Sequence, residues 1–188
     1  GLIYSVNPFG ADHMSSEHDN SYESYSSRLA ELGLVNPQPA RVLNAEKDRF
    51  AIYTQFAYSL LDTACVCSFV WGPYWQLYNL EQFTEMMGAV TGWNVNLFEL
   101  MKVGERRLNM MRAFNAREGV GREADTVPKK LTQGLQGGAS DGVIVTVEEI
   151  EAAKDLYFEM LGWDENGKPR RAKLEELALG WIADELGL

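Results

Sequence analysis

Apolar residues recur at three- and four-residue intervals between Ala45 and Ala64, and this spacing constrains the fold more strongly than any other feature of the chain. The residues in phase are Phe50, Tyr53, Phe56, Ala57, Leu60, Leu61 and Ala64. Side chains three and four positions apart lie on one face of an α-helix, so the pattern predicts a helix over 45–64. The chain shows no convincing alternating strand pattern, and the predicted class is all-α.

Further helices are predicted from residues that typically begin and end them. Two have a capping box, in which the cap residue and the residue three positions later each bond the other's backbone N–H. One helix is predicted over 80–90, where Asn79 and Gln82 form the capping box and Gly92 follows the end. A long helix is predicted from Asn94 to Gly119. Another is predicted over 147–161, where Thr146 and Glu149 form the capping box and Gly162 follows the end. Shorter ones are a helix over 22–32 and a final amphipathic helix with Leu174, Leu177 and Trp181.

The remaining segments are predicted to be loops. Residues 1–45 are rich in Ser, Asn, Asp and Pro, and 117–145 contain the cluster Gly134-Leu135-Gln136-Gly137-Gly138. Long loops of this kind tend to carry function or to cross between domains. With 188 residues, 46% of them hydrophobic, the chain can bury one ordinary core. We therefore expect residues 1–188 to form a single, irregular multi-helix domain with a long glycine-rich loop.

Charge and hydropathy argue against two classes of partner. The net charge is −10, whereas a nucleic-acid surface needs a basic patch to displace counterions. No apolar run approaches the roughly 20 residues of a membrane span.

The two cysteines, Cys65 and Cys67, are too close in sequence for an unstrained disulfide. Their spacing therefore favours a reducing compartment, the cytoplasm.

The segment Cys65-Val66-Cys67, at the end of the 45–64 helix, is the strongest candidate for metal chemistry. A zinc site or an iron–sulfur cluster normally has about four protein ligands, so a metal here would need ligands from outside the 188 residues. Asp62 precedes Cys67 by five residues, at a helix exit where backbone groups are free to bind a ligand. The alternative is that the thiols are small buried hydrophobes.

The two histidines, His13 and His18, occur close together with Glu17 and Asp19. Zinc proteases place two histidines on one helical face, but a five-residue separation puts side chains about 140° apart on a helix. Solvated loop histidines are therefore favoured over a local zinc site. A stand-alone metal site of His13, Glu17, His18 and the thiols stays open as an alternative. His13 is also a candidate general acid or base, because imidazole titrates near neutral pH.

Charged residues are dense on the predicted long helix. Glu105, Arg112 and Asn115 can share a face with the apolar positions Leu108 and Met111. A buried arginine costs free energy unless it is paired. The cluster is therefore interpreted either as ion pairs on the helix surface or as buried polar groups that have partners.

Taken in order, several motifs resemble the C-terminal part of the tungsten-containing aldehyde:ferredoxin oxidoreductase family. The matching segments are Asn7-Pro8-Phe9-Gly10-Ala11-Asp12-His13, Asp62 to Cys67, Gly104-Glu105-Arg106-Arg107-Leu108-Asn109, Arg112 to Gly119, Arg122, Asp125, Pro128-Lys129-Lys130-Leu131, Tyr157, Gly162-Trp163-Asp164, Gly167 and Pro169. They span nearly the whole chain. The resemblance implies the helical C-terminal fold of this family and a full-length enzyme with a tungsten bis-pterin cofactor beside a [4Fe-4S] cluster.

The resemblance also implies roles for individual residues. Cys67 corresponds to the last of four cysteine ligands of the cluster, and Asp62 with the backbone through Val66 corresponds to contacts with one pterin. His13 corresponds to a histidine that approaches the tungsten and passes a proton to or from the substrate oxygen. Cys65 stands where the family often has Gly, so its thiol is an unexplained addition.

The implied reaction of the full-length enzyme is oxidation of an aldehyde with water to a carboxylic acid, or the reverse, with electrons leaving through the cluster to a ferredoxin-like acceptor. The other cluster ligands and the N-terminal domains are not among these residues, so the isolated chain is expected to be inactive and without cofactor. Residues 1–45 are expected to lie near the active site and the Glu105–Glu118 stretch to be structural. Apolar surface meant for the other domains is expected to promote self-association. The alternative function is a noncatalytic helical interaction domain that keeps the family scaffold.

Overall fold

A computed structural model describes residues 1–188 as α-helices and short 3-10 helices without a β-strand. The α-helices are α1 (Leu2–Val6), α2 (Ser27–Ala30), α3 (Ala45–Thr63), α4 (Leu80–Thr91), α5 (Leu97–Arg117), α6 (Val147–Leu161), α7 (Arg171–Glu176) and α8 (Gly180–Glu185). The 3-10 helices are η1 (Asp19–Tyr22), η2 (Arg122–Ala124), η3 (Lys129–Thr132) and η4 (Gly138–Ser140). The prediction of an all-α fold is confirmed.

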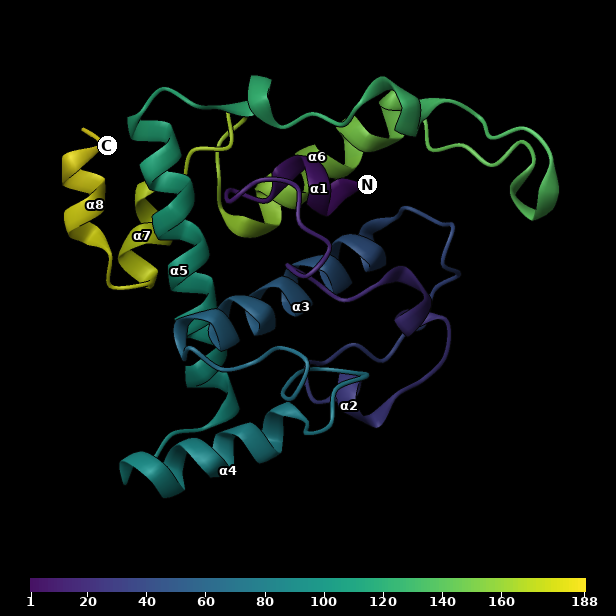
Figure 1. The fold of residues 1–188 in the computed structure, drawn as a ribbon. Coiled ribbons are helices and arrows are strands. Elements are labelled where there is room, and N and C mark those ends of the chain that lie inside the picture. The colour runs from purple at the N-terminus through teal and green to yellow at the C-terminus, as the bar shows by residue number, and fades with distance from the viewer.

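The two longest helices, α3 and α5, cross at the centre of the molecule (Figure 1). Gly104 of α5 lies directly against α3, where a Cβ atom would come within 2.0 Å of the Phe56 carbonyl oxygen. At the same crossing the Ser59 hydroxyl donates a hydrogen bond to the Gly104 carbonyl oxygen at 2.8 Å. Only glycine allows the two backbones to approach this closely.

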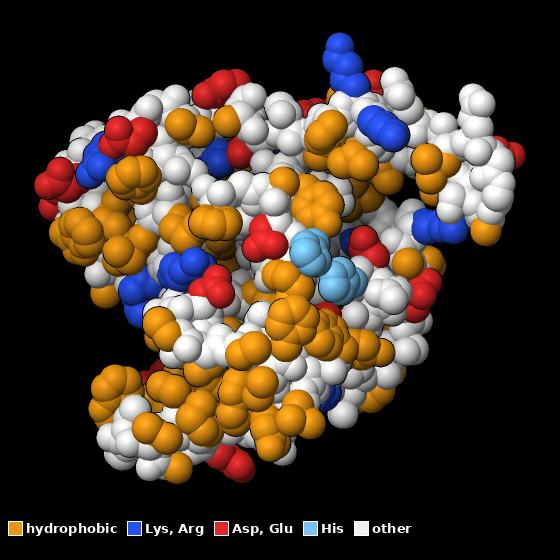
Figure 2. Space-filling view, viewed as in Figure 1, with side chains coloured by type: hydrophobic (Ala, Val, Ile, Leu, Met, Phe, Trp, Pro, Cys, Tyr) orange, Lys and Arg blue, Asp and Glu red, His pale blue; other side chains and the backbone are white.

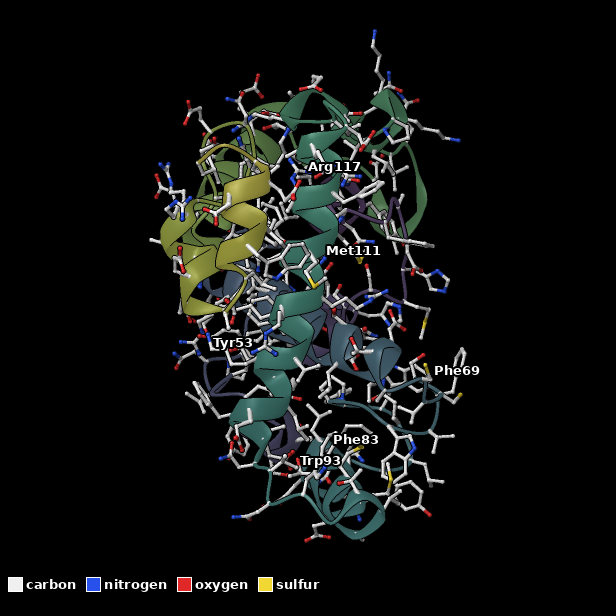
Figure 3. All side chains as sticks on the ribbon, turned by 90° about the vertical axis from the view of Figure 1, so that its left-hand side faces the viewer. Tyr53, Phe69, Phe83, Trp93, Met111 and Arg117 are labelled. Atoms are coloured by element: carbon white, nitrogen blue, oxygen red, sulfur yellow. The ribbon has the colours of Figure 1, made fainter.

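The other helices surround this crossing. α6 packs against α3 and α1, and α4 packs against α5. α7 and α8 pack against each other and lie beside the C-terminal half of α5 (Figure 1). In the side view, α5 extends from the neighbourhood of Trp93 past Met111 to Arg117 (Figure 3).

Three clusters of buried apolar side chains follow this arrangement. The first joins α1, α3, α5 and α6 and contains Leu2, Ile3, Val6, Ala51, Ile52, Phe56, Leu108, Ala153, Tyr157, Phe158, Leu161 and Trp163. The second joins α2, α3, α4 and α5 and contains Tyr22, Leu29, Leu32, Leu34, Phe50, Ala57, Leu60, Leu61, Leu80, Phe83 and Leu100. The third joins α5 to the C-terminal helices and contains Ala113, Leu174, Leu177, Leu179, Ile182 and Ala183.

Most predicted helix boundaries agree with the structure. The 45–64 helix is α3, and both predicted capping boxes are formed, by Asn79 with Gln82 and by Thr146 with Glu149. Gly92 and Gly162 adopt the left-handed conformation expected just after a helix.

Three boundary predictions were wrong. The long helix is capped by Asn96 instead of Asn94, because Asn96 forms a reciprocal capping box with Glu99. The final amphipathic helix is two helices, α7 and α8, since Ala178 turns the chain with φ +57°. Trp181 is consequently 59% exposed instead of in the core. The 22–32 helix is reduced to α2, and α1 was not predicted.

The segment between α5 and α6 is the predicted long loop. Residues 118–146 contain only 3-10 helices and irregular structure. The first part of the segment runs along the top of the molecule, where Asp125 is buried, and the part that contains η4 extends as an arm to one side (Figure 1). The Arg41 guanidinium reaches this arm, donating to the Ala139 carbonyl oxygen at 3.5 Å. None of the helices combines the length and the apolar character that crossing a bilayer requires.

Candidate functional site

The end of α3 sets the backbone that carries both cysteines. The Cys65 N–H donates to the Asp62 carbonyl oxygen and the Val66 N–H to the Leu61 carbonyl oxygen, each at 3.1 Å. These two bonds form a Schellman motif, in which the residue just after the helix takes a left-handed conformation. Cys65 occupies that position with φ +56°. Val66 packs against the cluster that contains Leu61, which is the apolar contact that commonly accompanies this motif.

This geometry explains why glycine suits position 65, where this chain has Cys65. A left-handed conformation is strained for residues with a Cβ and is the reason that glycine is common after helices. The requirement at position 65 is thus for a backbone conformation, which Cys65 meets at a cost. Its thiol is exposed and unpaired with another cysteine.

Cys67 lies in the turn that follows this motif. Its carbonyl oxygen accepts hydrogen bonds from the Val70 and Trp71 N–H groups at 3.0 and 3.1 Å. The turn fixes the backbone, and the thiol itself is free and exposed. The buried-hydrophobe alternative for Cys65 and Cys67 is therefore wrong. Phe69, two residues further on, projects from the surface (Figure 3). Its ring lies against that of Trp75, with centroids 5.4 Å apart.

Asp62 lies on the last turn of α3 with a largely exposed carboxylate. The Arg107 guanidinium of α5 lies 3.2 Å from that carboxylate and also donates to the Ser59 hydroxyl at 3.3 Å. The ion pair therefore orients Asp62 from the neighbouring helix while leaving it accessible.

His13 and His18 line an open cavity of about 380 Å³ together with Glu17, Lys47 and Arg41. The two imidazole rings stack with centroids 6.3 Å apart and are visible side by side near the middle of the face in Figure 2. His13 is exposed, and its Nδ1 is 4.0 Å from the Asp12 carboxylate.

The stand-alone metal site is not supported by this arrangement. No group of three His, Cys, Asp or Glu side chains is placed to hold a metal ion. Glu17 is buried instead of directed at the histidines, and it accepts hydrogen bonds from Ser21, Tyr58 and Gln76. Burial raises the pKa of Glu17, and these hydrogen bonds oppose the rise. Sequence reasoning considered Glu17 only as a metal ligand and missed this role.

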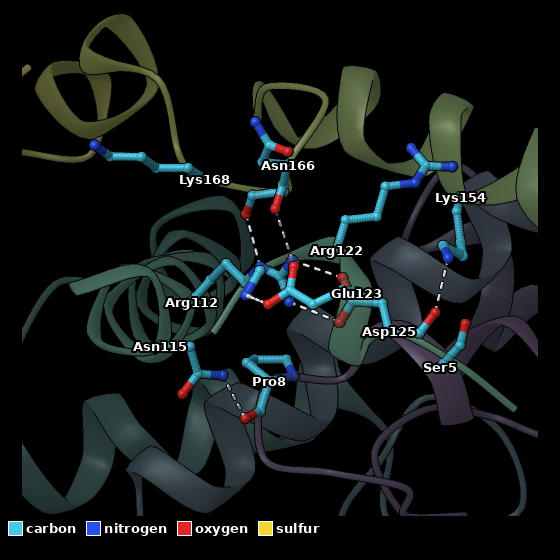
Figure 4. Close-up of polar contacts among 12 residues, drawn as sticks. Ser5, Pro8, Arg112, Asn115, Arg122, Glu123, Asp125, Lys154, Asn166 and Lys168 are labelled. Carbon is cyan, nitrogen blue, oxygen red and sulfur yellow. Dashed lines mark hydrogen bonds and ion pairs between the residues drawn. The ribbon is translucent and has the colours of Figure 1, made fainter. Parts of the chain in front are cut away.

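Arg112 of α5 forms the most buried ion pair in the molecule (Figure 4). Its guanidinium donates two hydrogen bonds to the Asp125 carboxylate, at 2.8 and 2.6 Å, and a third to the Gly167 carbonyl oxygen at 2.6 Å. The rings of Phe158 and Trp163 lie within 5.5 Å of it. The sequence left buried pairing and surface ion pairs open for this cluster, and Arg112 is buried and fully paired.

Glu105, on the same helix, belongs to a second network that joins α5 to α7. Its carboxylate binds Lys102 at 2.7 Å and Lys173 at 2.9 Å, and both lysines also bind Glu176. Burial would lower the pKa of Lys102 and Lys173, but their hydrogen bonds to the two glutamates outweigh it and raise both pKa values. The charged stretch of α5 therefore holds the fold together.

Other residues in and around the segments that resemble the family also stabilise the fold. The Tyr157 hydroxyl donates to Gln55, and Gln55 donates to the Asn7 side chain at 3.1 Å. Asn115 donates to the Pro8 carbonyl oxygen at 2.9 Å (Figure 4). These bonds fasten the backbone just before the His13 loop to α3 and α5, so the motif residues position the loop instead of lining the cavity.

The residues present fit one edge of a metal–cofactor site and no more. An iron–sulfur cluster normally takes about four thiolates, and Cys67 is an exposed, unpaired thiol on a fixed turn. Cys65 adjoins it, but two cysteines leave such a cluster incomplete. The remaining ligands would have to come from polypeptide outside residues 1–188.

Comparisons with known proteins agree with this description. Residues 1–179 match the sequence model of the family described as "Aldehyde ferredoxin oxidoreductase, domains 2 & 3". The tungsten-containing aldehyde ferredoxin oxidoreductase of Pyrococcus horikoshii is 28% identical over 181 residues, which are 95% of this chain and 27% of that protein. An aliphatic sulfonate oxidoreductase, WOR-like subunit, of Pyrococcus furiosus is 30% identical over 125 residues, 63% of this chain and 19% of that protein.

A solved structure supports the fold. The active site complex BamBC of benzoyl coenzyme A reductase superposes with a TM-score of 0.65 at 18% identity, covering 88% of this chain and 25% of that one. This chain therefore spans about a quarter of the length of the proteins it matches.

Proposed function

Since the chain belongs to the aldehyde ferredoxin oxidoreductase family, we propose that it is the C-terminal part of a tungsten-containing oxidoreductase that interconverts aldehydes and carboxylic acids. In this proposal electrons pass singly through a [4Fe-4S] cluster to a ferredoxin-like acceptor in the cytoplasm. Because the chain is 27% of the length of its relative, the other domains supply the rest of the site, and the isolated chain is inactive.

The proposal assigns a role to each candidate residue. Cys67 is the last thiolate ligand of the cluster, Asp62 and the backbone through Val66 contact a pterin, and His13 holds or releases a proton at the substrate oxygen. When bound, the metal–pterin group supplies the redox chemistry, and protein side chains orient the substrate and manage protons.

The exposed thiol of Cys67 on a fixed turn is the observation that carries this proposal. A metal ligand must be an accessible thiolate, and a thiol on a rigid turn needs little rearrangement to bind. The Schellman motif at Cys65 and Val66 provides that rigidity. His13 is exposed and lines the cavity, so its imidazole is accessible to a substrate.

The test is metal and sulfide analysis of the full-length protein prepared without oxygen. Wild type is expected to contain tungsten and about four irons, and Cys67→Ala to lose most of the iron. Cys65→Ala is the matched control, because it removes the neighbouring exposed thiol, and it is expected to keep the iron. Full iron content in Cys67→Ala would overturn the ligand assignment and favour the noncatalytic interaction domain.

The substrate class is tested separately with the loaded enzyme. Aldehydes are the proposed substrates, and the similarity to an aliphatic sulfonate oxidoreductase subunit makes aliphatic sulfonates the informative comparison. Faster turnover of sulfonates than of aldehydes would overturn the aldehyde assignment. His13→Gln, which keeps a polar side chain but cannot act as a general acid or base, is expected to lower turnover without changing the metal content.

A further inference from the structure

A buried carboxylate joins the loop that carries His13 to the segment that follows Cys67. Glu17 is 5% exposed, and its carboxylate accepts hydrogen bonds from Ser21 at 3.2 Å, from the Tyr58 hydroxyl at 3.1 Å and from the Gln76 side-chain amide at 3.1 Å. These donors belong to η1, to α3 and to the loop between α3 and α4.

The loop around Gln76 is itself built for this contact. The Gln76 amide oxygen accepts the Tyr74 N–H at 3.0 Å, so the side chain folds back over its own loop. Gly72 leaves room for it, because a Cβ atom there would lie 2.4 Å from the Gln76 side-chain carbon. Arg28 of α2 holds the same loop from outside through the carbonyl oxygens of Tyr74 and Gln76.

The His13 loop is held from the other side. The Glu17 N–H donates to the Thr54 hydroxyl of α3 at 3.2 Å, so both the backbone and the side chain of Glu17 are fixed four residues after His13. We propose that Glu17 is a positioning residue that sets the placement of the His13 loop relative to the segment after Cys67. The functional meaning of this junction rests on the roles proposed above for His13 and Cys67.

The junction requires a carboxylate of this length. Three side chains donate to Glu17, and an ionised carboxylate is an acceptor only, so it can satisfy all of them. Glutamine at the same position has one acceptor oxygen instead of two and lacks the charge that strengthens these hydrogen bonds. Its N–H group would face the Ser21 hydroxyl, which would have to turn from donor to acceptor. Aspartate keeps the charge but is shorter.

Hydrogen exchange of the 188-residue chain tests the junction without any cofactor. In Glu17→Gln, amide exchange is expected to accelerate by roughly tenfold or more both at 11–18 and at 72–78, whereas α4 stays protected. Glu46→Gln is the matched control, because Glu46, like Glu17, accepts a hydrogen bond from η1, from the Tyr22 hydroxyl at 2.7 Å, but is not bonded to the 72–78 segment. It is expected to leave both segments unchanged.

Gln76→Ala gives the reciprocal test. The substitution itself lies within 72–78, so accelerated amide exchange at 11–18 would support coupling through Glu17. If exchange changes only in the mutated segment, or if Glu46→Gln has the same effect on both segments, the inference is overturned. This outcome is distinct from failure of the proposed function, which is read from the iron content of Cys67→Ala.

Kinetics of the full-length enzyme separate positioning from general stability. Glu17→Gln is expected to lower kcat at least tenfold with KM and iron content nearly unchanged, because small misplacement of a reacting group is costly. Glu17→Asp, which keeps the acceptor, is expected to recover part of kcat. Equal losses in both variants, or loss of iron in Glu17→Gln, would contradict a positioning role.

Discussion

Replacing Asp48 with asparagine is expected to stabilise the chain at neutral and alkaline pH. Asp48 lies in the first turn of α3 with 1% exposure, and its Oδ1 atom has no hydrogen-bond partner. Burial raises the pKa of this carboxyl from 3.8 to about 7. The folded state therefore holds the proton over a pH range in which the unfolded chain has lost it.

The sign and size follow from these two pKa values. Between about pH 4 and pH 7 the folded state binds more protons than the unfolded state, so the free energy of unfolding falls as the pH rises. A difference from 3.8 to about 7 corresponds to a loss of roughly 4 kcal/mol above pH 7. The helix N-terminus favours the anion, and relaxation around it reduces the penalty, so we expect about 2–4 kcal/mol.

Urea unfolding followed by far-UV circular dichroism from pH 4 to pH 8 measures this effect. The curves of wild type and Asp48→Asn are expected to meet near pH 4 and to separate progressively up to pH 7. Glu159→Gln is the control, because Glu159 is exposed and has no ion pair, and its curve is expected to follow wild type. Parallel curves for wild type and Asp48→Asn at all pH values would refute the reasoning.

Three further substitutions test packing and backbone geometry by the same urea assay. Gly104→Ala is expected to destabilise the chain by about 3 kcal/mol or more, because the new methyl group meets the Phe56 carbonyl oxygen; a loss below about 1 kcal/mol would show that α3 and α5 move apart easily. Asp125→Ala is expected to cost roughly 3–5 kcal/mol by leaving the buried Arg112 guanidinium without a carboxylate partner, and a neutral result would contradict that burial. Cys65→Gly is expected to stabilise by about 0.5–1 kcal/mol by relieving a positive φ, and destabilisation would contradict the strain.

The parts of the fold that were predictable are those encoded by local contacts. The boxes at Asn79 and Thr146 depend on bonds between residues three positions apart, which a short sequence window contains. Asn96 with Glu99 has the same pattern and could have been found in this way. The break at Ala178 has no such signal, because alanine rarely adopts a positive φ.

The candidate site was less accessible to sequence reasoning. The roles of His13 and Cys67 came from the family resemblance, since spacing alone left loop histidines and buried thiols open. Glu17 could not be interpreted correctly, because its partners Tyr58 and Gln76 lie 41 and 59 residues away in sequence. At position 65 the structure requires a left-handed backbone conformation, and the chemistry of a cysteine side chain does not reveal that requirement.

The network that joins Glu105 and Glu176 to Lys102 and Lys173 affects how the molecule responds to heat. The hydration of charged groups becomes less favourable as temperature rises, whereas the stabilisation from apolar burial reaches a plateau. The contribution of these ion pairs to the attachment of α7 to α5, relative to that of the apolar contacts, therefore grows as the temperature rises. Because the pairs are partly exposed, added salt weakens this contribution, and the thermal resistance of the C-terminal helices becomes a function of ionic strength.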